Sequence, residues 1–91
     1  MGYSLYIVEC ADGTFYTGIA TDVQRRVLEH NRAKGKGARY TSARRPVVLV
    51  FETRFATRSD ALKEEARIKQ LTRRQKQTLI SAARAVAATG P

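Results

Sequence analysis

The hydrophobic positions at the start of the chain fall into two short runs with intervening polar residues, which predicts a β-hairpin. Residues 3–10 and 14–19 form these runs, and Ala11-Asp12-Gly13 separates them. An Asp-Gly pair between two strand-like runs is a strong hairpin signal, because both central residues of the preferred turn take positive φ. We therefore expect two antiparallel strands joined at this turn.

The segment that follows, residues 22–33, has the spacing of a helix. Its apolar stripe should cover one face of the sheet and consists of Val23, Val27 and Leu28. Thr21 followed three residues later by Gln24 matches a capping box, in which the two side chains bond each other's backbone N–H groups. The pattern predicts a helix that begins just after Thr21.

Two more helices are predicted in the second half of the chain. Residues 59–70 follow a cap at Thr57 or Ser59, and their apolar stripe is Ala61, Leu62 and Ile68. A second capping box, Thr72 with Gln75, starts a third helix that we expect to cover the sheet. Its apolar side is Leu79, Ile80, Ala83 and Val86.

A continuous apolar run, residues 47–51, directly follows Pro46 and predicts a third strand. Because it lacks alternation, we expect it to be the most buried strand. These elements predict an α+β fold over residues 1–91, a single domain with a three-stranded, mainly antiparallel sheet flanked by helices.

Charge changes the picture. Seventeen Lys and Arg against eight Asp and Glu give a formal net charge of +9, which favours an anionic partner, most simply nucleic acid. Much of the charge lies in the segment 34–45, where two glycines exclude a helix. The candidate nucleic-acid-binding residues there are Lys34, Lys36, Arg39, Tyr40, Arg44 and Arg45. The alternative is a solvated connection whose tyrosine packs on the core.

The single cysteine and the short apolar runs argue against a disulfide-linked, zinc-binding or membrane-spanning protein. Cys10 is the only cysteine, so there is no intrachain disulfide, and one Cys with one His cannot build a zinc site. We expect Cys10 to be a small buried hydrophobe. No apolar run approaches the ~18 residues of a membrane span and no signal peptide is evident. These features predict a cytoplasmic protein that does not bind membranes.

One carboxylate stands out in the second predicted helix. Glu65 lies within the apolar stripe, three residues from both Leu62 and Ile68, whereas Glu64 lies off it. A carboxylate on an apolar face is costly without a cation, a donor or a metal. Glu65 is therefore a candidate metal ligand, and the alternative is a salt bridge at the edge of the stripe.

The spacing of four polar and aromatic residues resembles the GIY-YIG nuclease motif, over roughly residues 3–76. Tyr6 ends the first triplet, Tyr16-Thr17-Gly18 follows ten residues later, and Arg26 comes eight after the glycine. The resemblance is closest to the small stand-alone YhbQ-like (UPF0213) branch. The chain departs from the motif at Ser4, where the first glycine is missing, and at Ile19, where many catalytic members carry lysine.

The resemblance implies a catalytic set and a cofactor. The set is Tyr6, Tyr16, Arg26 and His30, with Glu65 as the metal ligand; the segment that ends in Glu65 resembles the metal-binding one. A single carboxylate suits Mg²⁺ or a similar divalent cation such as Mn²⁺, with no other cofactor. The general base is Tyr16, Tyr6 or His30. A histidine titrates near neutrality without help, whereas the resemblance favours a tyrosine.

The expected function is a metal-dependent nuclease that hydrolyses nucleic-acid phosphodiester bonds. We expect a DNA endonuclease of low sequence specificity, or one whose specificity a partner supplies, because no separate targeting domain is visible. The alternative is a non-catalytic nucleic-acid-binding module that keeps the fold. A pure binding module has no need of a carboxylate on an apolar helix face, which favours the nuclease.

Overall fold

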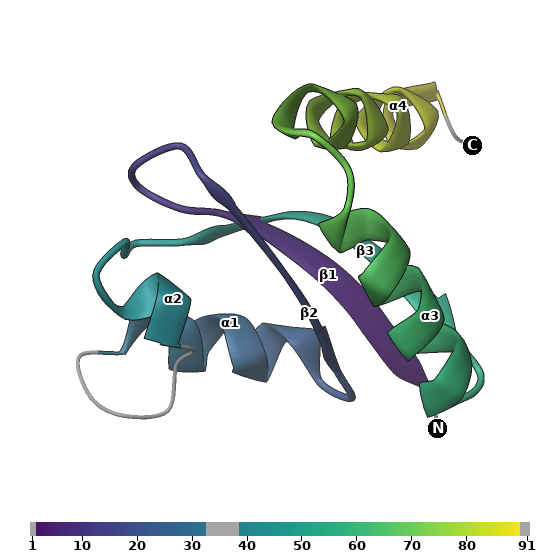
Figure 1. Ribbon diagram of the computed structural model, residues 1–91, viewed down its shortest axis with the longest axis horizontal. Helices are drawn as coiled ribbons and strands as arrows, with labels where there is room; N and C mark the ends of the chain where they lie inside the picture. Colours follow the sequence, from purple (N-terminus) through teal and green to yellow (C-terminus); the bar gives the residue numbers. More distant parts are fainter. Residues whose placement is uncertain (1, 33–38, 90–91) are drawn as a thin grey trace.

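The computed structural model describes residues 2–32 and 39–89, and in them three strands carry helices on both faces of one sheet (Figure 1). The elements are β1 (Tyr3–Glu9), β2 (Phe15–Ala20), α1 (Val23–Asn31), α2 (Arg39–Ser42), β3 (Val48–Phe55), α3 (Arg58–Lys69) and α4 (Arg73–Thr89). The strand order is β2-β1-β3, and β1 pairs antiparallel with both neighbours. The predicted α+β class and three-stranded antiparallel sheet are confirmed.

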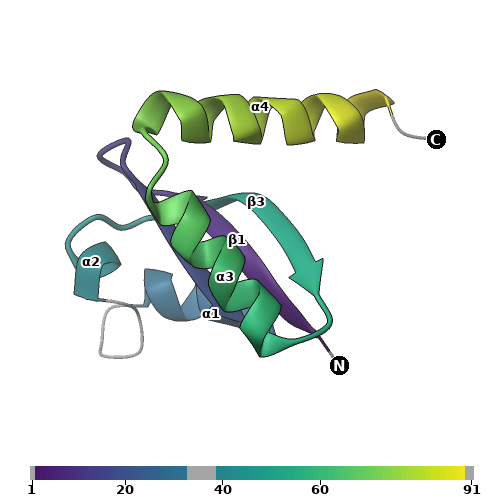
Figure 2. The same ribbon diagram turned by 45° about the vertical axis from the view of Figure 1, so that its right-hand side comes forward.

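The central strand β1 is buried from both sides. Leu5 and Ile7 are fully buried in a cluster with residues of α3 and α4, whereas Tyr6 and Val8 belong to a second cluster with residues of α1. Alternate residues of a strand point to opposite faces, so both halves of the core rest on this strand. Figure 2 shows α1 on one side of the sheet and α3 and α4 on the other.

The prediction that the third strand is the most buried is wrong. β3 is an edge strand, and Val48 at its start is 61% exposed. The pairing with β1 jumps from Ile7↔Phe51 to Val8↔Leu49, which leaves Val50 as an extra residue in a β-bulge. Because of the bulge, Val50 and Phe51 both pack on the α3–α4 side. The unbroken apolar run therefore serves both faces of the sheet, since Val47 and Leu49 pack on the α1 side, but it lies on an edge strand whose side chains are only partly buried.

The hairpin turn also differs from the expected type. Only Gly13 has positive φ, at 82°, and no non-glycine residue of the described chain does. The Gly13 N–H donates to the Cys10 carbonyl at 2.9 Å, and the Cys10 N–H donates to the Thr14 carbonyl at 2.8 Å. Asp12 instead uses its side chain, which accepts from the Thr14 hydroxyl at 2.6 Å. The glycine thus supplies the one left-handed residue that the turn needs.

Helix α1 is shorter than predicted and has a different cap. Asp22, not Thr21, is the N-cap, and its carboxylate accepts from the Arg25 N–H at 3.1 Å. Leu28 is 60% exposed and does not belong to the buried stripe. The face toward the sheet consists of Val23, Val27 and His30. The polar His30 is therefore buried where the sequence predicted Leu28.

Helices α3 and α4 begin as the caps predict. Thr57 caps α3 by accepting from the Asp60 N–H, and Thr72 and Gln75 bond each other's N–H groups before α4. On α3, Ala61 and Ile68 are buried as expected, but Leu62 is 38% exposed.

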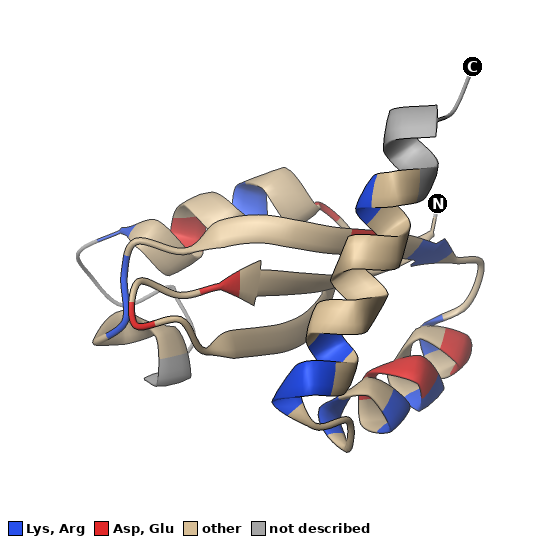
Figure 3. Ribbon diagram, turned by 90° about the horizontal axis from the view of Figure 1, so that it is seen from above, with Lys and Arg blue, Asp and Glu red and all other residues tan. Residues whose placement is uncertain are grey.

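Helix α4 crosses the sheet on the side of α3 (Figure 3). Ile80 is buried against the core there and Leu79 packs beside it, as the sequence predicted. The Val86 side chain lies outside the described residues. No helix in the described ranges is both long and apolar enough to cross a bilayer. On the opposite face, Cys10 is buried beside Val8, as expected, and this burial raises the pKa of its thiol.

Candidate active site

The hairpin brings two tyrosines to the face of the sheet that α1 covers. Tyr6 on β1 lies opposite Gly18, and Tyr16 on β2 lies opposite Val8. Two such positions are diagonal neighbours on one face, and the ring centroids are 6.5 Å apart. The His30 ring of α1 lies 5.9 Å from the Tyr6 ring and 5.2 Å from the Tyr16 ring. Three residues predicted from spacing are therefore in mutual contact.

Gly18 leaves the space that the Tyr6 side chain occupies. A Cβ atom placed on Gly18 would lie 2.6 Å from the Tyr6 hydroxyl oxygen and 2.8 Å from Cζ. Both distances are too short for non-bonded atoms, and the residue is in the middle of a strand with a buried side chain beneath it. A residue without a side chain is thus required opposite Tyr6.

We expect Gly18→Ala to destabilise the protein by about 1–3 kcal/mol, the usual cost of forcing extra volume into a packed core. Urea unfolding measures this cost. The same substitution in a Tyr6→Leu background is the control, because the shorter side chain removes the clash. An equal cost in both backgrounds would mean that Gly18 is needed for a reason other than Tyr6.

His30 is fully buried and hydrogen-bonded at both ring nitrogens. Nε2 lies 2.9 Å from the Tyr6 hydroxyl, and Nδ1 lies 2.7 Å from Oγ1 of Thr41 on α2. Burial, helped by the charge of Arg26, lowers the pKa of His30. The expectation that His30 titrates near neutrality without help is wrong, because desolvation favours the neutral ring.

Tyr6 is held as a neutral phenol. Burial and the neighbouring Tyr16 raise the pKa of Tyr6 to about 12, although Arg26 hydrogen-bonds to its hydroxyl and acts in the opposite direction. Only 1% of Tyr6 is exposed. At neutral pH its hydroxyl therefore keeps its proton and serves as a hydrogen-bond donor and acceptor.

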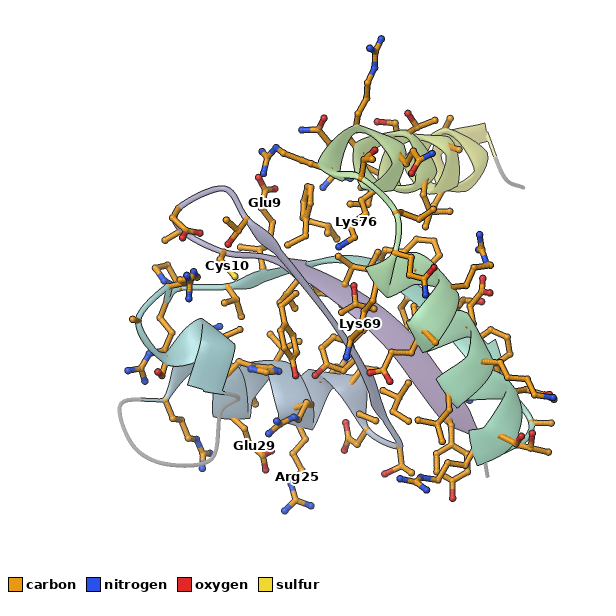
Figure 4. The ribbon with its side chains drawn as sticks, viewed as in Figure 1. Glu9, Cys10, Arg25, Glu29, Lys69 and Lys76 are labelled. Atoms are coloured by element: carbon orange, nitrogen blue, oxygen red, sulfur yellow. The ribbon has the colours of Figure 1, made fainter. Side chains whose placement is uncertain are left out.

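Arg26 connects this aromatic cluster to solvent. Its guanidinium donates to Glu29 at 3.1 Å and to the Tyr6 hydroxyl, and its side chain is 29% exposed. A depression of about 230 Å³, lined by residues that include Ala20, Arg25 and Arg26, opens beside it. Arg25 also pairs with Glu29 but points away from the sheet, with its side chain 74% exposed (Figure 4).

The two acids of α3 have different surroundings. The charge of Glu65 is among the smaller causes that raise the pKa of Tyr6, and the Glu65 side chain is 18% exposed. Glu64 is bound by Arg67 through two hydrogen bonds of 2.6 Å, on an exposed part of the helix. Helical geometry separates adjacent residues by about 100°, so only one of them can face the hairpin.

Glu65 already has a cationic neighbour. Lys69, one turn further along α3, places Nζ 3.5 Å from Oε2 of Glu65, and Figure 4 shows its side chain extending toward the hairpin. This ion pair is the salt bridge at the edge of the apolar stripe that the sequence offered as the alternative to a metal ligand. Among the described residues no group of three or more His, Cys, Asp or Glu side chains is gathered as for a protein-only metal cage.

The structure describes part of the candidate nucleic-acid surface. Lys34 and Lys36 lie outside the described residues, and of Arg39 and Tyr40 only the backbone of α2 is described. The prediction that this segment contains no helix is wrong, because the short helix α2 begins after both glycines. Arg44 pairs with Asp12 of the hairpin turn at 3.0 Å, and Arg45 donates to the Ser42 carbonyl at 2.9 Å. Arg44 therefore holds the segment beside the hairpin, whereas Arg45 bonds within the segment itself.

Three residues of this region were missed by sequence reasoning. Thr41 has no spacing signal, because its partner His30 is eleven residues away across a connection. Lys69 did have a spacing signal, since it follows Glu65 by a single helical turn. Arg73 donates to the Gly13 carbonyl and lies 5.2 Å from the Phe15 ring, at the basic start of α4 that Figure 3 shows in blue.

Known proteins match both the motif and the fold. Residues 2–78 match the model of the GIY-YIG catalytic domain. This chain belongs to the GIY-YIG family. GIY-YIG proteins are a family of nucleases that act on nucleic acids and generally use divalent metals, so nuclease family membership is established for this chain.

The relatives place the chain in the UPF0213 group of the GIY-YIG family. A UPF0213 protein of Desulfotalea psychrophila is 55% identical over 78 residues, which are 86% of this chain and 70% of that protein. One of Halobacterium salinarum is 53% identical over 77 residues, 85% of this chain and 97% of that protein. The predicted family and branch are thus confirmed.

Two structures solved by NMR in solution share the GIY-YIG fold of this chain. A UPF0213 protein from Bacillus halodurans is 45% identical with a TM-score of 0.58, and the match covers 90% of this chain and 85% of that one. A protein from E. faecalis is 38% identical with a TM-score of 0.64, covering 93% and 88%.

Proposed function

We propose that this protein is a metal-dependent endonuclease that hydrolyses phosphodiester bonds in nucleic acid, with DNA as its substrate and low intrinsic sequence specificity. The observation that carries the proposal is the contact of Tyr6, Tyr16 and His30 in one cluster, to which Arg26 is hydrogen-bonded. A net charge of +9 supports a polyanionic substrate.

The residues near Glu65 fit a hydrated hard cation. A single carboxylate with its side chain 18% exposed offers one charged oxygen ligand and access from water. Mg²⁺ binds well to such sites because it keeps most of its waters, and Mn²⁺ can replace it. The cation would supply charge neutralisation at the phosphate and stabilise the leaving oxygen. Lys69 competes for the same carboxylate.

Arg26 is proposed to bind the scissile phosphate. Its guanidinium is a planar fork that matches two non-bridging oxygens, and Glu29 and Tyr6 restrict its orientation. The depression beside it gives a phosphate access from solvent. A donor held in place before the reaction stabilises developing charge without reorganisation.

Tyr16 is the proposed general base. Tyr6 is buried with its pKa raised to about 12, and both nitrogens of His30 are engaged, so neither is suited to take a proton directly from water. Tyr16 is half-buried and packs against His30. As the base it would take the proton of the attacking water, and a cation held by Glu65 would supply positive charge to the same site. Tyr6 then acts by holding Arg26 and His30.

A plasmid-nicking assay tests the proposal. We expect the purified protein to nick supercoiled DNA with Mg²⁺ or Mn²⁺, to stop when EDTA is added, and to lose the activity in Glu65→Ala. Matched RNA substrates test the choice of nucleic acid. Binding of DNA without cleavage at any metal concentration would instead identify a non-catalytic binding module.

The basic residues of segment 34–45 lead to a separate prediction about DNA binding. Replacing Lys34, Lys36 and Arg39 with Ala should weaken DNA binding and flatten its salt dependence. The slope of log affinity against log salt should fall by about 0.7–0.9 for each phosphate that the variant no longer binds. Fluorescence anisotropy across a salt series measures the slope.

A second triple variant, Arg58, Lys63 and Arg67 to Ala, removes the same charge from α3 and is the control for this measurement. If both triple variants change the slope equally, the effect is one of overall charge and the segment is only a connection.

A further inference from the structure

We infer that Thr41 is a positioning residue: its Oγ1 fixes the tautomer of His30 and thereby the direction of the hydrogen-bond chain that holds Arg26. This inference deepens the proposed function and rests on it for the role of Arg26. The chain of contacts runs from Arg26 through Tyr6 and His30 to Thr41.

The donor chemistry of Arg26 sets the direction at one end. A guanidinium only donates, so the Tyr6 oxygen accepts from Arg26 and the hydroxyl hydrogen is available for His30. Because Tyr6 is buried, its hydroxyl hydrogen needs an acceptor, and Nε2 of His30 lies 2.9 Å from the oxygen. A neutral ring that accepts at Nε2 carries its hydrogen on Nδ1. That hydrogen points to Oγ1 of Thr41 at 2.7 Å. Thr41 is thus the acceptor that completes the sequence.

Thr41 is suited to this role because it is buried from solvent and its backbone is held by a hydrogen bond. It is fully buried on α2, and its carbonyl accepts from the Arg44 N–H at 2.9 Å. Arg44 is in turn held at the hairpin turn, where its carbonyl accepts from the Ala11 N–H at 2.9 Å and its side chain pairs with Asp12. The acceptor for His30 is therefore anchored to the same hairpin that carries both tyrosines.

Loss of this acceptor should reverse the donor and acceptor roles along the hydrogen bonds from Thr41 to Tyr6. With valine at position 41 the Nδ1 hydrogen is buried without a partner, which favours its transfer to Nε2. The Nε2–H then donates to the Tyr6 oxygen, and the Tyr6 hydrogen turns toward the N–H groups of Arg26. Arg26 then loses one of the acceptors that restrict its orientation and keeps Glu29, although the carbon skeleton of the cluster is unchanged.

The tautomer can be read directly, because His30 is the only histidine in the chain. We expect ¹⁵N NMR of the wild-type protein at neutral pH to show a protonated Nδ1 and an unprotonated Nε2. Thr41→Val should move the proton to Nε2, wholly or in part, and Thr41→Ser should retain the wild-type pattern. A wild-type spectrum with the proton on Nε2 would overturn the inference, even if Thr41→Val does not fold.

Nuclease activity gives the second measurement. Thr41→Val should lower kcat by roughly 10- to 100-fold, the range that follows loss of the partner that orients a metal-bound histidine, with KM nearly unchanged. Thr41→Ser should restore most of the rate.

Thr17→Val is the matched control. Thr17 is also buried, but its Oγ1 has no hydrogen-bond partner in the described part of the chain, and Thr17 pairs with Ile7, whose side chain lies on the α3–α4 side. Thr17→Val should leave both the His30 signals and the rate unchanged.

The two measurements separate this inference from the proposed function. If the wild-type protein cuts no nucleic acid, the nuclease proposal fails, but the tautomer in the wild-type and Thr41 variants still decides the role of Thr41. If cleavage occurs and Thr41→Val keeps both the Nδ1–H tautomer and the rate, Thr41 is only a packing residue and the inference is wrong.

Discussion

Arg26→Ala should lower nuclease activity by roughly 10²–10³-fold while the fold remains intact, because one fixed donor to a developing phosphate charge is worth about that much. The side chain is 29% exposed and does not belong to either hydrophobic cluster of the core. Glu29 keeps a partner, since Arg25 also pairs with it, at 3.4 Å. Cleavage of plasmid DNA under saturating metal, with circular dichroism to confirm folding, measures the effect.

The neighbouring arginine provides the control for this prediction. Arg25→Ala removes the same charge from the same helix and the same ion pair with Glu29, but Arg25 points away from the cluster. We expect the rate of Arg25→Ala to stay within a few-fold of wild type. If Arg25→Ala and Arg26→Ala lose activity equally, the helix contributes only charge, and the assignment of Arg26 to the phosphate is wrong.

Glu65→Gln should abolish metal-dependent cleavage, whereas Glu64→Gln should not. A neutral amide is a much weaker ligand for a hard cation than a carboxylate. Glu65 acts electrostatically on Tyr6, and Glu64 is occupied by Arg67. The measurement is cleavage against Mg²⁺ concentration for both variants. Calorimetric titration with Mn²⁺ and no substrate gives an independent measure of metal binding.

The stability of these two variants should change little. Each acid makes one ion pair on a partly exposed helix surface, and such pairs contribute about 0–1 kcal/mol. Glu65→Gln should not improve folding, although the residue lies on the apolar stripe, because Lys69 already pairs with the carboxylate. Should Glu64→Gln be inactive and Glu65→Gln active, the face of α3 assigned to the metal is wrong.

Local features of the sequence determined most of the fold. The Thr72–Gln75 capping box and the Thr57 cap depend on groups three residues apart, so sequence spacing alone locates them. The same holds for the hairpin, where Gly13 provides the positive φ. The predictions of burial failed where packing between elements, rather than the spacing of apolar residues, decides which side chains are covered. Leu28 is exposed because His30 occupies the buried face, and β3 lies at an edge despite its apolar run.

The sequence by itself also determined which side chains make up the candidate site. Spacing on two paired strands and on one helix turn brings Tyr6, Tyr16, Arg26 and His30 together, because strand register and helical pitch are regular. Their protonation and partners were decided only by the tertiary structure. Thr41 reaches His30 across a connection with no periodicity, and burial raises the pKa of Tyr6 and lowers that of His30. Desolvation depends on the packing of all neighbouring elements at once, and no local pattern of residues encodes it.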